Sequence, residues 1–209
     1  MAKAYWVAHV DVTDSSGYQS YRGAIAESFQ KYGAIFLVRD GRSESVEGAS
    51  RSRHVVVGFK DYETALACYR SAEYQKTLDF RRDAGLIDFI AIAGYDGPQP
   101  SDSETVPASA ARGYWIGHVD VTEPEGYKAY MAADMAPIGQ YRGRFLVRGG
   151  TFEQLEGTVR SRTVVLEFPS YDVARACYRS AEYQNAAALR KGKAEFDLVI
   201  AEGCAGPQP

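Results

Sequence analysis

The sequence predicts an α+β fold of two similar modules whose antiparallel sheets pack face to face. Three observations support this prediction. The two halves of the chain repeat each other, each half alternates strand and helix patterns, and the predicted sheet of each half keeps one face that its own helices do not cover.

The repeat is found by shifting the chain by 109 residues, and it needs no gap. The matching segments are YWVAHVDVT (5–13) with YWIGHVDVT (114–122), FLVR (36–39) with FLVR (145–148), and ACYRSAEYQ (67–75) with ACYRSAEYQ (176–184). Solenoids need three or more repeats, so two long copies predict paired domains. We expect modules at 1–100 and 112–209. The segment 101–111, rich in Ser, Ala, Pro and acidic residues, is typical of a linker.

The first predicted element of each module is a strand. In residues 5–12, Trp6, Ala8, Val10 and Val12 alternate with Tyr5, Val7, His9 and Asp11. One face is therefore apolar, and the other becomes polar toward the end of the strand. Asp14 or Ser15 can cap the following helix, in which aromatic and aliphatic residues recur every three or four positions until Gly33.

The remaining elements follow in order. Residues 35–39 form a second strand, DG at 40–41 indicates a turn, and 42–50 is a polar stretch. Residues 54–59 are β-branched and apolar, as in a central strand. Asp61 caps a second helix, Ser71 restarts a short one, and 88–94 form the last strand.

This order, βαββαβ, predicts a ferredoxin-like module: a four-stranded antiparallel sheet with both helices on one face. The other face of the sheet is left bare and partly apolar. The second copy supplies a matching sheet to cover it, so we expect an intrachain pseudo-dimer, with a further homodimer as an open alternative.

Composition excludes several partners. The net charge of −3 and the mixed charge signs argue against nucleic acid. No apolar run approaches the ~20 residues that span a membrane, and the N-terminus enters a strand pattern directly, so a cytoplasmic location is expected. The three cysteines form no CxxC pair, and Cys68 and Cys177 are expected to be small buried apolar residues.

Several motifs resemble the domain of unknown function 1330 family. They are YWVAHVDVTDSSGYQSY, FLVR followed by DG or GG, an ExxEG segment at 44–48 and 153–157, and CYRSAEYQ followed by Arg81 or Arg190. The resemblance spans each module and implies the dimeric α+β barrel superfamily, in which two ferredoxin-like sheets close a barrel. That superfamily includes cofactor-free monooxygenases, isomerases, heme-degrading enzymes and ligand-binding modules. The family itself implies no activity.

The candidate site residues are on the polar sheet face. Strand alternation is expected to turn His9, Asp11 and Arg39 into the barrel, with His118, Asp120 and Arg148 in the second copy. The histidines are candidate catalytic bases, and the Asp and Arg residues are candidate binding groups. The favoured alternative is structural: Asp11–Arg39 and Asp120–Arg148 would be ion pairs that join the sheets.

Function stays open between two classes at this level. One is a cofactor-free small-molecule enzyme, monooxygenase- or isomerase-like, acting on a planar or carbonyl substrate. The other is a non-catalytic ligand-binding or assembly module. No HxH, HxxxH or CxxC spacing predicts a metal site, no cofactor is expected, and heme bound through a single histidine is the weaker alternative. Because Gly58 and Ala93 become Glu167 and Glu202, a ligand is expected to prefer one module.

Overall fold

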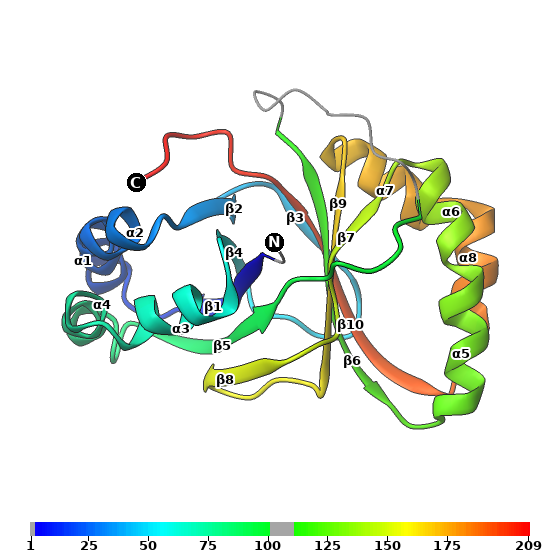
Figure 1. Cartoon of the computed structure of the whole chain (residues 1–209), viewed down its shortest axis with the longest axis horizontal. Coiled ribbons are helices and arrows are strands. Elements are labelled where there is room, and N and C mark those ends of the chain that lie inside the picture. The colour runs from blue at the N-terminus through cyan, green and yellow to red at the C-terminus, as the bar shows by residue number, and fades with distance from the viewer. Residues whose placement is uncertain (1–2, 101–110) are drawn as a thin grey trace.

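A computed structural model describes residues 3–100 and 111–209 of the chain (Figure 1). The expected linker, 101–111, lies outside the described residues except for Ala111. The structure confirms the α+β fold class. Helices α1–α4 lie on one side of the molecule and α5–α8 on the other, with the strands between them.

The first module follows the predicted order with additions. Its elements are β1 (Ala4–Val12), α1 (Ser15–Ala24), α2 (Ala26–Tyr32), β2 (Ile35–Arg39), β3 (Ser43–Glu47), β4 (Arg53–Phe59), α3 (Tyr62–Arg70), α4 (Ala72–Thr77), a 3₁₀ turn (Leu78–Phe80) and β5 (Gly85–Ala93). Asp14, Asp61 and Ser71 cap helices through their side chains, as the sequence predicted. The single helix expected before Gly33 is two helices that meet at Ile25.

The second module repeats these elements. They are β6 (Gly113–Val121), α5 (Pro124–Ala133), α6 (Met135–Gln140), β7 (Arg144–Arg148), β8 (Phe152–Glu156), β9 (Arg162–Phe168), α7 (Tyr171–Arg179), α8 (Ala181–Ala188) and β10 (Ala194–Glu202). No helix in the described parts of the chain is long and apolar enough to cross a membrane.

The two modules exchange a strand, which the sequence analysis missed. The sheets have the orders β2-β4-β1-β5-β8 and β3-β10-β6-β9-β7, so each four-stranded sheet gains a fifth strand from the other module. Strand β3 comes from the polar stretch expected at 42–50, and it pairs antiparallel with β10. Its residues are exposed or half-buried, so hydrophobic periodicity could not reveal it.

The exchange closes the barrel. Each β2–β3 or β7–β8 turn passes from the edge of one sheet to the edge of the other. The two GPQP tails then cover the β2 and β7 edges: Gln99 bonds to the main chain of Phe145, and Gln208 bonds to that of Phe36. Covering a sheet edge removes a surface that otherwise invites aggregation.

Side-chain alternation along the central strands separates the cores under the helices from a core between the sheets. Trp6 and Trp115 each pack under the helices of their own module, in two similar clusters. Between the sheets lies a third cluster that combines Tyr5 and Val7 with Tyr114 and their neighbours. The predicted alternation of the first strand is therefore confirmed, and it places His9 between the sheets.

Candidate functional site

The three histidines of the chain form one hydrogen-bonded row between the two sheets. His9 Nδ1 lies 2.8 Å from His54 Nδ1, and His9 Nε2 lies 2.8 Å from His118 Nε2. His118 Nδ1 is 3.0 Å from Thr163 Oγ1. Each neutral imidazole can donate with one nitrogen and accept with the other, so the row is satisfied with all rings uncharged.

The electrostatics keep this row neutral. Burial lowers the pKa of His118 and of His54 to about 4. The pKa of His9 lies well below its usual value, mainly because the ring is buried and in addition because a charge on it would be repelled by His118, His54 and Arg51. The row borders an open cavity of about 340 Å³ that Arg51 and Arg160 also line. The structure places His54 within the row, although the second copy has Thr163 at the repeat position.

Asp11 and Asp120 do not pair with the arginines that the sequence suggested. Asp11 Oδ2 lies 3.1 Å from Arg51 Nη1, and Asp120 Oδ2 lies 3.0 Å from Arg160 Nη1. These arginines also bind carboxylates on β5 and β10: Arg51 binds Asp88 and Arg160 binds Asp197, each at 2.6 Å. The expected Asp11–Arg39 and Asp120–Arg148 pairs are therefore wrong.

The cause is an irregularity in the short edge strands. The register against β4 shifts between Phe36 and Val38, and the same shift occurs in β7 between Phe145 and Val147. Phe36 consequently packs under the helices whereas Val38 packs between the sheets. A bulge of this kind reverses the alternation of the residues that follow it, so Arg39 returns to the helix side.

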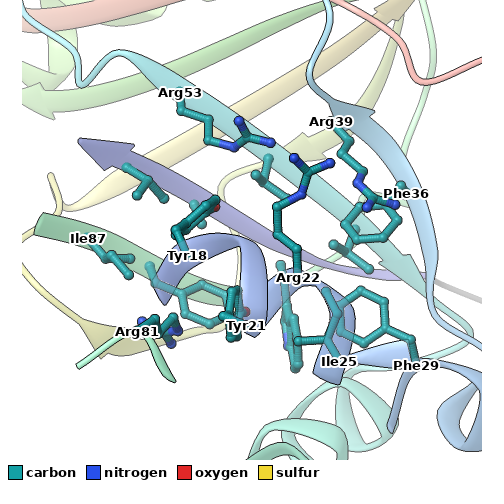
Figure 2. Close-up of a pocket in the computed structure, with 16 residues that line it drawn as sticks. Tyr18, Tyr21, Arg22, Ile25, Phe29, Phe36, Arg39, Arg53, Arg81 and Ile87 are labelled. Carbon is teal, nitrogen blue, oxygen red and sulfur yellow. The ribbon is translucent and has the colours of Figure 1, made fainter. Parts of the chain in front are cut away.

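Arg39 lies at a cavity between the helices and the sheet of the first module (Figure 2). Its guanidinium is 4.4 Å from the centre of the Phe36 ring. Apolar walls surround the cavity, which encloses about 50 Å³ and opens to solvent; the lining includes Trp6, Tyr18, Tyr21, Ile25, Phe29, Phe36 and Phe89. Tyr18 and Tyr21 thus pack among the core residues of the first module and also line this cavity.

Three guanidinium groups meet a single carboxylate at this cavity. Figure 2 shows Arg22 between Arg39 and Arg53. Asp40 binds Arg22 at 2.5 Å, binds Arg53, and lies 3.6 Å from Arg39. The Asp40 side chain is 42% exposed, and Arg53 Nε is buried without a hydrogen-bond partner. Burial is the main cause that lowers the pKa of Arg39 and of Arg53.

The matching cavity of the second module is closed by its own side chains. Met131 replaces Arg22, Asp134 replaces Ile25 and Phe196 replaces Ile87, and the cavity encloses only about 20 Å³. Arg148 lies here rather than between the sheets: its Nη2 donates to the main-chain oxygen of Met131 at 3.1 Å and lies 3.6 Å from Asp134 Oδ1. The two pockets therefore differ, although their walls are repeats of each other.

Sequence comparison assigns the family. The model of the family described as Domain of unknown function (DUF1330) matches residues 3–95 and 112–204. The chain belongs to this family. The comparison with curated proteins gives no match.

Comparison with solved structures shows the barrel fold. An anthrone oxidase-like protein has a TM-score of 0.57 at 14% identity, and the match covers 99% of this chain and 93% of that one. A candidate monooxygenase from Fusobacterium nucleatum subsp. nucleatum has a TM-score of 0.55 at 10% identity, covering 100% and 97%. A candidate chlorite dismutase has a TM-score of 0.53 at 13% identity, covering 99% and 97%. At these identities the likeness concerns the fold.

Two motifs of this DUF1330 chain bind each other across the modules. Glu156, from the ExxEG segment on β8, accepts hydrogen bonds from Arg81, which follows CYRSAEYQ in the other module. Glu47 and Arg190 make the reciprocal pair. The sequence showed both motifs but contained no signal that they meet.

Other predicted groups have structural surroundings. Burial raises the pKa of the Cys68 and Cys177 thiols to about 12, so neither is a ready thiolate. Among the described residues, no group of three or more His, Cys, Asp or Glu side chains is placed to hold a metal ion. Both ring nitrogens of His9 and His118 bond to protein groups, an arrangement that leaves neither free as an axial ligand for heme.

Proposed function

We propose that the helix–sheet cavity of the first module binds a small planar molecule as an anion, and that the protein is a cofactor-free enzyme of the monooxygenase class acting on a phenolic or enolisable carbonyl compound. The charge arrangement at Arg22, Arg39, Arg53 and Asp40 carries the proposal. One exposed carboxylate faces three guanidiniums, which leaves two positive charges beside an aromatic pocket.

The walls suit a planar ring. Aromatic faces and edges favour stacked or edge-on contacts with another ring, and the apolar surroundings strengthen the attraction of a guanidinium for an anion. A six-membered ring needs a cavity of roughly 150 Å³. The enclosed space is about 50 Å³, so a bound ring must move the outer side chains of Arg22 and Arg39, which are 33% and 25% exposed.

The chemistry follows from anion stabilisation. A guanidinium beside a phenol or enol lowers its pKa, and the resulting carbanion-like carbon can reduce O₂. For an activated methylene, loss of a proton and addition of O₂ give a hydroperoxide, which eliminates water to leave a carbonyl. In this step Asp40, which binds the arginines at the rim of the cavity, would accept the proton. The fold neighbours described as a candidate monooxygenase and as anthrone oxidase-like support this reaction class for the chain.

A non-catalytic binding module is the second candidate, and one observation favours it. The described residues that line the cavity include no His, Asp, Glu, Lys or Cys. Proton removal would thus depend on Asp40 at the rim, whereas binding needs only the arginines and the rings. Oxygen uptake in the presence of an anthrone separates these candidates: uptake that Asp40→Asn lowers supports the enzyme, and none with a bound anthrone supports the binding module.

His9 and His118 border the cavity that Arg51 and Arg160 line, whereas Arg22, Arg39 and Arg53 line the helix–sheet cavity. We infer that the histidine row joins the sheets, since its hydrogen bonds link strands of both modules. A catalytic role for His9 and His118, a binding role for Asp11 and Asp120, a cytoplasmic location and a further homodimer stay predictions.

Binding of an anion is tested with 4-nitrophenol, whose phenolate absorbs visible light. We expect the full chain to lower the apparent pKa of this probe. Arg39→Met should remove the effect, because it takes away one rim charge but leaves the aromatic walls. Arg82→Met is the matched control, since Arg82 is an exposed arginine that pairs with Asp79. Identical titrations of the probe with and without protein would overturn the proposal.

A further inference from the structure

The second module carries an internal carboxyl group in the pocket that the first module leaves open. Asp134 lies at the junction of α5 and α6, at the repeat position of Ile25. It is 5% exposed and lines the cavity with Arg148 and Arg162, the repeat partners of Arg39 and Arg53. The chain thus contains the same pair of repeated arginines with and without a buried acid beside them.

The buried acid is held next to a guanidinium in an apolar setting. Asp134 Oδ1 lies 3.6 Å from Arg148 Nη2, and it makes no hydrogen bond of its own. Arg148 and Arg162 also act on its ionisation: burial raises the pKa of Asp134 to about 7, and the two arginines oppose the rise. A buried carboxyl group therefore lies against Arg148 in this pocket.

The first module lacks this buried acid. Ile25 is apolar and 5% exposed, and it lines the cavity where Asp134 stands in the other copy. Asp40 binds the arginines from the exposed rim, at the position of Gly149. Arg53 Nε is buried without a hydrogen-bond partner, as is Arg162 Nε in the second module. The first pocket thus combines three guanidiniums with an apolar floor and has no acid at the position of Asp134.

We propose that the first module takes a small aromatic or enolisable monocarboxylate, whose carboxylate lies against Arg39 as the Asp134 carboxyl lies against Arg148 in the second module. This inference rests on the proposed function and specifies the anion. The planar carboxyl of Asp134 shows a group that Arg148, the repeat partner of Arg39, accommodates. At this repeat position the first module has Ile25, whose apolar surface can contact the remainder of the ligand.

Charge and size favour a monocarboxylate over a larger anion. Three guanidiniums and Asp40 leave an excess of two positive charges, and one carboxylate lowers that excess without reversing it. Inorganic phosphate lacks the apolar part that the aromatic walls would contact. Benzoate combines both features, and benzamide has the same shape without the charge.

The test is calorimetric binding of benzoate, benzamide and inorganic phosphate to the full chain. We expect one benzoate per chain and at least about tenfold weaker binding of benzamide, the ratio that loss of a charge-assisted hydrogen bond gives. Ile25→Asp should remove benzoate binding, because it places in the first pocket the acid that closes the second. Asp134→Ala is the matched control and should leave this binding site intact.

Two further variants guard against misfolding of Ile25→Asp. Arg39→Met should weaken benzoate at least about tenfold while benzamide changes little. Met131→Arg combined with Asp134→Ile and Phe196→Ile gives the second module the three lining residues that distinguish the first pocket, and should raise the stoichiometry to two. Equal affinity for benzoate and benzamide, tighter binding of phosphate, or no benzoate binding would overturn the assignment. If 4-nitrophenolate binds but benzoate does not, the proposed anion pocket stands and the carboxylate class falls; if neither binds, both fall.

Discussion

Arg81 of the first module donates to both carboxylate oxygens of Glu156, which lies on the strand that the second module adds to the sheet of the first. The Arg81 side chain is 4% exposed, and its guanidinium lies 5.0 Å from the centre of the Tyr21 ring. A buried cation with one carboxylate partner depends on that partner. The pair therefore ties the exchanged strand to the helices of the module it enters.

Each half of the chain should be unable to exist as a stable monomer. Residues 1–100 or 112–209 alone would lose the fifth strand of their sheet and expose the apolar inter-sheet face. We expect each half to dimerise or aggregate, because a self-copy can supply the missing strand. Sedimentation of each half checks this, with the full chain as the reference. A folded monomeric half at micromolar concentration would contradict the exchange as a requirement for folding.

Removing Arg81 should destabilise the protein strongly. Arg81→Met leaves Glu156 partly buried without its cation, and breaking a buried pair costs about 3–5 kcal/mol. The double variant with Glu156→Leu should recover much of that loss, since neither charge is then left alone. Urea unfolding measures both. Arg82→Met, at an exposed arginine, is the control and should change stability by less than about 0.5 kcal/mol. A double variant no more stable than Arg81→Met would show that the pair is not the source of the effect.

The sequence predicted the elements that carry strong periodicity and missed those that depend on the other module. The alternation of β1 placed His9 correctly because Trp6 and Val7 select opposite cores. The five residues of β2 show no alternation that could reveal its bulge, so Arg39 was assigned to the wrong face. Asp11 was matched to Arg39 by that same error, although Arg51, in a polar loop, is its partner.

The candidate site was only partly predictable for a related reason. Pairing between distant charges depends on the register of strands from both modules. The residue pattern within one strand does not encode that register. The row of three histidines, for example, needs β1, β4 and β6 at once. A detectable signal did exist for the arginine pocket. Comparing the copies position by position shows Arg22 against Met131 and Ile25 against Asp134, and these are the changes that make the pockets unequal.

The histidine row should make the protein sensitive to mild acid. The pKa values of His9, His54 and His118 are all lower in the folded state than the unfolded value of 6.5. The unfolded chain therefore binds more protons below that pH, so stability is full above pH 6.5 and is lost as the pH falls toward about 4. For His54 alone the loss is on the order of 3 kcal/mol.

His54→Thr tests this assignment with a residue that the chain already uses. Thr163 bonds to His118 in the second copy, so a threonine at 54 can bond to His9 without a third imidazole. We expect a smaller loss of stability between pH 7 and pH 4.5, measured by urea unfolding at each pH. An unchanged slope would show that other groups cause the acid sensitivity.

Asp134 should oppose the histidines in the same pH range. Its folded pKa of about 7 lies above the ordinary aspartate value of 3.8, so the folded state holds a proton that the unfolded chain releases. The stability that this proton contributes is fully present below pH 3.8 and is lost as the pH rises through 7, by at most about 4 kcal/mol.

Asp134→Asn keeps the shape of the side chain and removes the titration. The variant should therefore gain stability relative to the parent protein as the pH rises from 5 to 7.5, and its own stability should rise more steeply with pH because only the histidines remain. Asp79→Asn, at a carboxylate that is 72% exposed, is the control and should follow the parent curve. A stability difference between Asp134→Asn and the parent that stays constant over this range would mean that Asp134 is ionised throughout, and that the guanidinium of Arg148 outweighs the burial of the carboxyl group.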